Sequence, residues 1–190
     1  TTGSMACFLD FNMLTPDWKS VSPSRGSATG DTLIQISAPF CGFPTTSNVT
    51  CSFQGAPDQL AIADASSSGT GAGAILRCNT PAWGAMYPAD NVSFFLSFNG
   101  TQGIGPDYGP SLFEFELYAY HLNPASAAIS STNALYLNGS GYDAAVSYAL
   151  QFESQGKSKM VPMSFVSSTL IQGTYDEQSL SGSARVIPVA

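Results

Sequence analysis

The fold is decided by a stretch near the middle of the chain, Ser93-Phe94-Phe95-Leu96-Ser97-Phe98. In an extended chain successive side chains point to opposite faces, so Phe94, Leu96 and Phe98 share one face. Three further segments repeat this alternation: residues 32–37 (TLIQIS), 113–117 (FEFEL) and 134–137 (ALYL). Apolar residues at every second position are typical of half-buried antiparallel strands.

Turn-forming residues separate the predicted strands. Residues 99–101 (NGT) and 138–141 (NGSG) combine Asn and Gly, which accept the backbone angles of tight turns. No stretch shows a convincing 3.6-residue period, so long helices are not expected. Short strands with turns roughly every 8–12 residues are typical of β-sandwiches. The predicted fold class is therefore all-β.

An internal repeat divides the chain into two modules. Residues 8–16 (FLDFNMLTP) resemble residues 117–124 (LYAYHLNP), and each segment is an alternating strand that ends at a proline. A turn and a new strand follow each copy. We therefore predict an N-terminal strand segment at residues 1–16, a first sandwich at 17–118 and a second, divergent and incomplete sandwich at 119–190.

The charge pattern argues against several classes of partner. The net charge is −7, and the chain has only six basic residues. Nucleic acids and anionic membrane surfaces both require clusters of basic side chains, so neither partner is expected. No run of about 18 apolar residues occurs, so no membrane span is expected in this chain.

The cysteines and sequons indicate an extracellular or cell-surface protein. The four cysteines form no CxxC pair, and a single His cannot complete a zinc finger, so disulfides are expected. Sequons for N-linked glycans begin at Asn48, Asn91, Asn99 and Asn138. We expect Asn99 and Asn138 to be the best acceptors, because each opens a predicted turn. The alternative is a cytosolic protein whose sequons carry no glycans and whose thiols are free.

The first module carries the motifs of a known domain family. Residues 21–36 (VSPSRGSATGDTLIQI) resemble the opening segment of IPT/TIG domains, with Asp31 in place of the family's second Gly. Further matches follow in the family's order: residues 49–55 (VTCSFQG), 76–81 (LRCNTP), 92–100 and 113–117. The second module resembles the family only loosely, since it lacks the paired cysteines and the first turn.

The resemblance implies an immunoglobulin-like sandwich and, together with the repeat, two tandem sandwiches. It also implies a Cys51–Cys78 disulfide, for which the loop-entropy model gives about 3–4 kcal/mol. By exclusion Cys7 and Cys41 would pair, or Cys7 would bond to another chain. The family occurs in cell-surface receptors, adhesion proteins, accessory modules of polysaccharide-acting enzymes and transcription factors. The acidic charge and the expected disulfides argue against the last of these.

Catalytic chemistry is not indicated. The single His, His121, has no nucleophile motif beside it, and Glu114 and Glu116 alternate with core Phe residues, as on a solvated strand face. The glycine-rich residues 66–73 (SSSGTGAG) lack the helix and Lys of a phosphate loop. We therefore expect no enzyme activity, no catalytic residue, no cofactor and no metal site.

Two aromatic residues are candidates for ligand contact. Trp83 and Tyr87 lie between predicted strands, where an exposed ring can stack on a sugar or anchor a protein interface. The structural alternative is that these two side chains pack over one end of the sandwich. An exposed site would make the chain a carbohydrate-binding accessory module of a larger secreted protein.

The second module is one strand shorter than the first. If residues 185–189 correspond to 92–98, no counterpart of residues 113–117 follows them, whereas residues 8–14 form a strand of that type. The alternative is a piece of a longer array of modules. Either way, the second module has an open edge that another strand must cover.

The N-terminal strand is the expected cover. Its uniformly apolar side consists of Leu9, Phe11 and Met13, which we expect to fill the second module of a neighbouring copy. Such a head-to-tail contact propagates as a filament unless it closes into a ring. The expected function is that of an extracellular, glycosylated structural or adhesion protein, with itself and N-linked glycans as partners.

Overall fold

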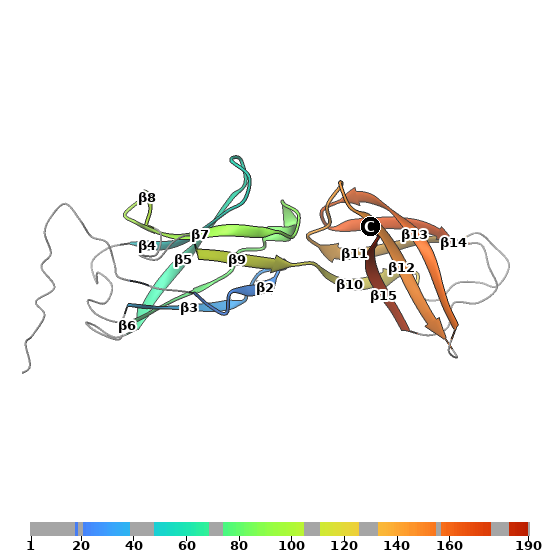
Figure 1. Ribbon diagram of the computed structural model, residues 1–190, viewed down its shortest axis with the longest axis horizontal. Coiled ribbons are helices and arrows are strands. Elements are labelled where there is room, and N and C mark those ends of the chain that lie inside the picture. Colours follow the sequence, from blue (N-terminus) through green and yellow to red (C-terminus); the bar gives the residue numbers. More distant parts are fainter. Residues whose placement is uncertain are drawn as a thin grey trace, which may run out of the picture. The chain divides into compact units, whose positions relative to one another are not determined.

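A computed structural model of the chain describes residue 18 and residues 21–38, 48–68, 74–104, 111–125, 133–154, 157–175 and 183–189. Its regular elements in these residues are strands, with one short 3-10 helix, so the fold is all-β as expected (Figure 1). No helix in the described part of the chain is long and apolar enough to cross a membrane.

The contacts divide the chain into two compact units. The first comprises Thr1–Gly26, Gly30–Pro81 and Asp90–Glu114, and the second comprises Ser27–Thr29, Ala82–Ala89 and Phe115–Ala190. The main change of unit thus falls between Glu114 and Phe115, four residues before the expected boundary at 118. The 3-10 helix η1 (Trp83–Ala85) belongs to the second unit, although the sequence places it between strands of the first.

The first unit is a sandwich built on one continuous path of paired strands. The path runs β1-β3-β6-β5-β4-β7-β9-β2, with β8 also paired to β7. Strand β5 links the two layers, because it pairs with β4 through Leu60–Asp64 and with β6 through Ala65–Ser68. The strands are β1 (Val21–Ser22), β2 (Arg25–Ser27), β3 (Leu33–Ala38), β4 (Val49–Gln54), β5 (Leu60–Ser68), β6 (Ala74–Asn79), β7 (Asn91–Phe98), β8 (Thr101–Ile104) and β9 (Ser111–Glu116).

The core of the first unit consists of the rows that alternation predicted. Ile34 and Ile36 on β3 are buried, as are the three predicted inward residues of β7. Phe94 packs edge-on against Phe53 and Trp18, with ring centroids 5.2 and 5.6 Å apart. Such edge-to-face pairs add stabilisation beyond the buried area.

A disulfide ties the two layers of the first unit together. Cys51 on β4 and Cys78 on β6 are bonded, with their Cα atoms 6.6 Å apart, which confirms the pairing that the family resemblance implied. Both side chains are buried. Cys7 and Cys41 lie outside the described residues.

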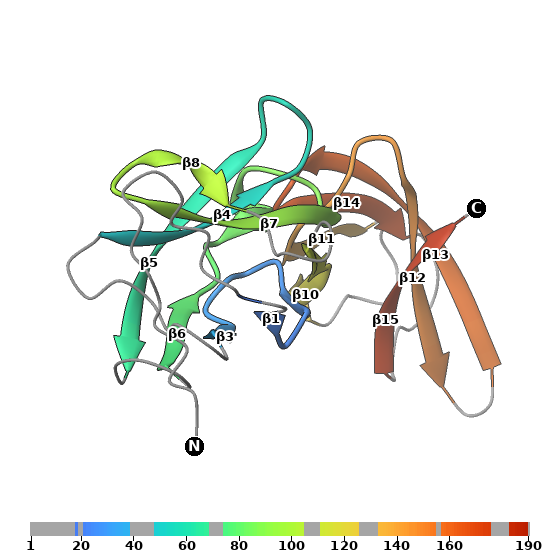
Figure 2. The same cartoon turned by 60° about the vertical axis from the view of Figure 1, so that its left-hand side comes forward.

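The second unit is a single antiparallel sheet of six strands in the order β10-β11-β14-β13-β12-β15 (Figure 2). Its buried core gathers side chains from four of these strands, with Leu135, Leu150 and Ile171 almost fully enclosed. The strands are β10 (Tyr118–Asn123), β11 (Asn133–Ser140), β12 (Ser147–Ser154), β13 (Lys157–Ser167), β14 (Leu170–Tyr175) and β15 (Ser183–Val189).

One of the two predicted turns is correct and the other is wrong. Asn99 and Gly100 have positive φ angles of 51° and 75°, as expected between β7 and β8. Residues 138–140, in contrast, continue strand β11, and only Gly141 has a positive φ. A Cβ at Gly139 would lie 2.6 Å from the hydroxyl of Tyr142 and 2.7 Å from the carbonyl of Tyr118, so this glycine makes room for close packing.

We predict that loss of the disulfide destabilises only the first unit. The Cys51→Ala/Cys78→Ala variant should lose about 3–4 kcal/mol of unfolding free energy, because the unfolded chain regains the freedom of a 27-residue loop. Denaturant titration monitored by tyrosine and tryptophan fluorescence would measure this. Both bonded cysteines lie in the first unit, so a shift of the second unit's transition in this variant would contradict the assignment.

A second prediction concerns Tyr142, whose hydroxyl is buried without a hydrogen-bond partner among the described residues. Burial is the main cause that raises the pKa of Tyr142 far above its usual value, with the Tyr148 phenol adding to it. Tyr142→Phe removes an unsatisfied polar group and should stabilise the second unit by about 1 kcal/mol.

The matched control is Tyr148→Phe. The Tyr148 hydroxyl accepts a hydrogen bond of 2.8 Å from the Asp143 amide, so its loss should destabilise the unit by about 1 kcal/mol. Thermal unfolding of both variants measures the difference. Equal destabilisation by the two substitutions would show that the Tyr142 hydroxyl is satisfied.

Candidate strand-binding pocket

Two strands of the second unit, β10 and β15, each pair on one side only. Strand β10 pairs with β11, from Tyr118↔Ser140 to Asn123↔Tyr136, and β15 pairs with β12 from Ser147↔Val189 to Glu153↔Ser183. No other strand in the described residues pairs with their free sides. The unit therefore presents two rows of backbone N–H and C=O groups that lack a ladder partner.

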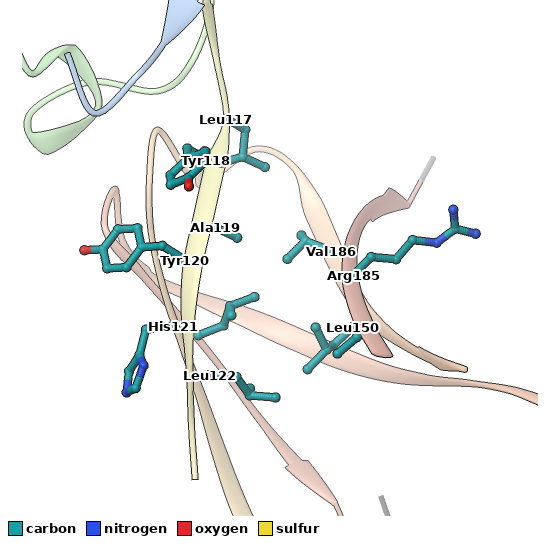
Figure 3. A pocket seen from close by; sticks show the side chains of 11 residues that line it. Leu117, Tyr118, Ala119, Tyr120, His121, Leu122, Leu150, Arg185 and Val186 are labelled. Carbon is teal, nitrogen blue, oxygen red and sulfur yellow. The ribbon is translucent and has the colours of Figure 1, made fainter. Parts of the chain in front are cut away.

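A pocket of about 520 Å³ lies between these two strands and is called the edge pocket here. Figure 3 shows Leu117, Ala119 and Leu122 pointing from the β10 segment toward Leu150 and Val186. Leu117, Leu122 and Val186 are only partly buried and pack against the unit's core. The edge pocket thus opens onto the core of the second unit.

A β-bulge gives β10 its apolar side. The pairing with β11 shifts between Ala119 and His121, so Tyr120 is the extra residue. Without the bulge, Leu122 would alternate to the face opposite Leu117 and Ala119. With it, all three side chains face the pocket, whereas Tyr118, Tyr120 and His121 lie on the other side (Figure 3).

The charged residue at the pocket rim does not point inward. Arg185 extends away from the pocket in Figure 3. Its guanidinium lies 3.4 Å from a carboxylate oxygen of Glu153, and its Nε donates a 3.0 Å hydrogen bond to Gln151. The side chains that face the pocket are therefore apolar, which suits an apolar strand better than an ionic ligand.

The expected donor residues Leu9, Phe11 and Met13 lie outside the described residues. The structure therefore describes the pocket and not the expected donor. Sequence patterns did not single out the pocket residues Leu150 and Val186, because each belongs to an ordinary alternating strand. Only the open edge of the second module was expected.

The sequons occupy two kinds of site. Asn48, Asn91 and Asn99 are exposed. The Asn99 side-chain oxygen accepts a 2.9 Å hydrogen bond from the Asn48 amide, so these two sequons are adjacent. Asn138, which was expected to open a turn, is half-buried within β11 and paired on both sides.

Trp83 is fully buried, so of the two interpretations of this residue the structure supports packing and not ligand contact. Its ring stacks on Phe115 with centroids 5.1 Å apart, and its indole N–H donates a 2.7 Å hydrogen bond to the Pro88 carbonyl. No face of this indole is free for a sugar ring. Tyr87 packs against Trp83 and remains partly exposed. The exposed aromatic pair is instead Tyr118 and Tyr120 on β10.

Comparisons with known proteins give a likeness in fold. No family model matches the chain, and no curated protein matches it. Two structures of the plexin A4 extracellular region, covering domains 1 to 10 and 1 to 8, are similar over 86% and 89% of this chain. Both share 13% sequence identity, with TM-scores of 0.33 and 0.35. The chain spans 13% and 24% of the length of those chains.

We predict that glycan occupancy follows exposure rather than turn chemistry. In chain secreted from a eukaryotic host, Asn91 and the adjacent Asn48 and Asn99 should carry glycans, and Asn138 should be occupied least. Peptide mapping after enzymatic deglycosylation measures each site. Ser93→Ala is the control, because it removes the Asn91 sequon while keeping the asparagine. Three bare exposed sequons would count against an extracellular protein.

Proposed function

We propose that the protein is an extracellular, glycosylated structural or adhesion subunit whose copies join head to tail by strand addition. The observation that carries this proposal is the edge pocket, an open pocket with apolar inward side chains between two strand edges that lack a partner in the described residues. Exposed edges invite pairing with another chain, and natural proteins cover them. An added strand would satisfy both edges at once.

The extracellular setting is supported by the disulfide and the sequons. A buried disulfide persists in oxidising compartments, and three of the four sequons are exposed. The IPT/TIG type that we propose for the first unit is supported by its motifs. Residues 21–36 form β1 to β3, and the two motif cysteines are bonded.

The interface would be heterologous, because the donor and the acceptor are different surfaces of the chain. Such contacts build rings or open filaments. Filling the pocket with three large apolar side chains would contribute about 1.5–3 kcal/mol each before ordering costs. Backbone pairing along both edges would add to this, and specificity would come from the alternate side chains.

A charge inside the pocket should abolish assembly. Ala184 on β15 is exposed and lines the pocket, so Ala184→Lys should fold normally while its ammonium group blocks an apolar strand. Sedimentation velocity should show concentration-dependent oligomers of the wild type and monomers of this variant. Negative-stain microscopy would separate filaments from rings.

The matched control is Met160→Lys, which places the same charge on β13, a strand that does not line the pocket. Met160 is 45% exposed, so this variant should assemble like the wild type. Circular dichroism would verify that both variants are folded. A wild type that stays monomeric at all concentrations, or equal behaviour of the two variants, would refute assembly through the pocket.

A further inference from the structure

The first unit contains a strand in the place that the second unit leaves open. Its path ends β4-β7-β9-β2, whereas the path of the second unit ends β12-β15. The preceding strands correspond in order: β3 to β11, β6 to β14, β5 to β13, β4 to β12 and β7 to β15. Strand β10 stands where the first unit has β1 and β2. In the described part of the second unit, β15 therefore lacks both a counterpart of the short β8 and, along the path, a counterpart of β9.

Strand β9 shows how that place is filled. It runs antiparallel to β7, with Val92 opposite Phe113 and Asn91 opposite Glu114. It runs parallel to β2, because the Glu114 amide donates to the Ser24 carbonyl and the Ala28 amide donates to the Glu116 carbonyl. Phe113 and Phe115 are buried on one side of β9.

Resting on the proposed function, we infer that residues 8–14 of a second copy occupy the edge pocket in the place of β9. The added strand runs antiparallel to β15 and parallel to β10. Leu9, Phe11 and Met13 face the core of the accepting unit, at the spacing of Phe113, Phe115 and Leu117. The seven residues of this segment match the length of β15.

The donor segment precedes the first described residue of the chain. Trp18 is the first described residue of the chain, and it is fully buried against Phe94. The segment before it ends at Pro16, which would stop the ladder, since proline has no N–H to donate. Residues 8–14 therefore precede the anchored tryptophan, and their sequence alternates so that one side is uniformly apolar.

The polarity follows from the register of the second unit. Tyr118 pairs with Ser140 at one end of the sheet, and Val189 pairs with Ser147. Neighbouring strands alternate in direction along the whole path, so β10 and β15 are antiparallel to each other. The N-terminal end of the donor must therefore lie beside Tyr118 and Val189, and its C-terminal end beside Asn123 and Ala184.

A peptide of residues 8–16 tests both the identity and the polarity of the donor. The acceptor is the full chain with Phe11→Asp. It should be a folded monomer, because the charge at position 11 prevents its own donor strand from binding to an apolar pocket. A spin label at the N-terminus of the peptide should broaden the amide signals of Tyr118 and Val189. A label at its C-terminus should broaden those of Asn123 and Ala184. The reverse pattern would overturn the inferred polarity.

Two variant peptides control for specificity. Phe11→Asp in the peptide should weaken binding at least about tenfold, because a buried aromatic ring contributes more than 1.4 kcal/mol. Asn12→Asp lies on the outward side and should change the affinity less than about twofold by the same conversion. An equal loss of affinity with both variant peptides would show that the inward-facing side chains do not determine binding.

The outcomes separate this inference from the proposed function. If the wild type assembles but the Phe11→Asp chain assembles equally well, the donor is another segment, and assembly through the pocket still stands. If the wild type is monomeric at all concentrations and resists the peptide, its own strand fills its own pocket. That result overturns the second copy as occupant. A wild type that is monomeric and binds the peptide refutes both the proposed function and the second copy as occupant, and supports only the identity and polarity of the segment that fits the pocket.

Discussion

The hydrogen bonding of strand edges is the constraint on which this structure depends. A sheet satisfies its backbone internally except at its two outermost strands, so each unit must deal with two edges. The first unit does so with β9, which is held between β7 and β2. The second unit has the same succession of strands up to β15. In the described residues, no strand follows β15 in that succession. In the described residues, β10 and β15 therefore each pair on one side only, and the edge pocket lies between them.

Alternation along the sequence predicted the fold well, because burial in a sheet follows the period-2 rule directly. Every predicted inward residue of β7 is buried, and Leu135 and Leu137 on β11 are buried as well. The turn at residues 138–141 was predicted wrongly for a physical reason. Glycine is required there by the close approach of Tyr142 and not by a turn, and composition alone cannot distinguish the two uses.

The candidate site could be predicted only in outline. An open edge in the second unit followed from counting strands, but the shape of the pocket depends on the bulge at Tyr120. A bulge changes which residues face the core, and simple alternation does not reveal it. Trp83 illustrates a second limit of sequence patterns. Its position between strands suggested exposure, although Phe115 and Pro88 enclose its ring. Long-range packing, which local patterns do not contain, decides both cases.

The Cys51–Cys78 bond also limits how far the chain can be stretched. The bond closes a loop across 27 positions, which would otherwise extend to about 90 Å when fully drawn out. A force applied to the two ends of the chain is transmitted through the disulfide bond, so the loop that this bond closes does not extend. The first unit can therefore lose its strand pairing under load without releasing the loop. The fully extended module is therefore shorter by that length, while the residues outside the loop remain free to extend.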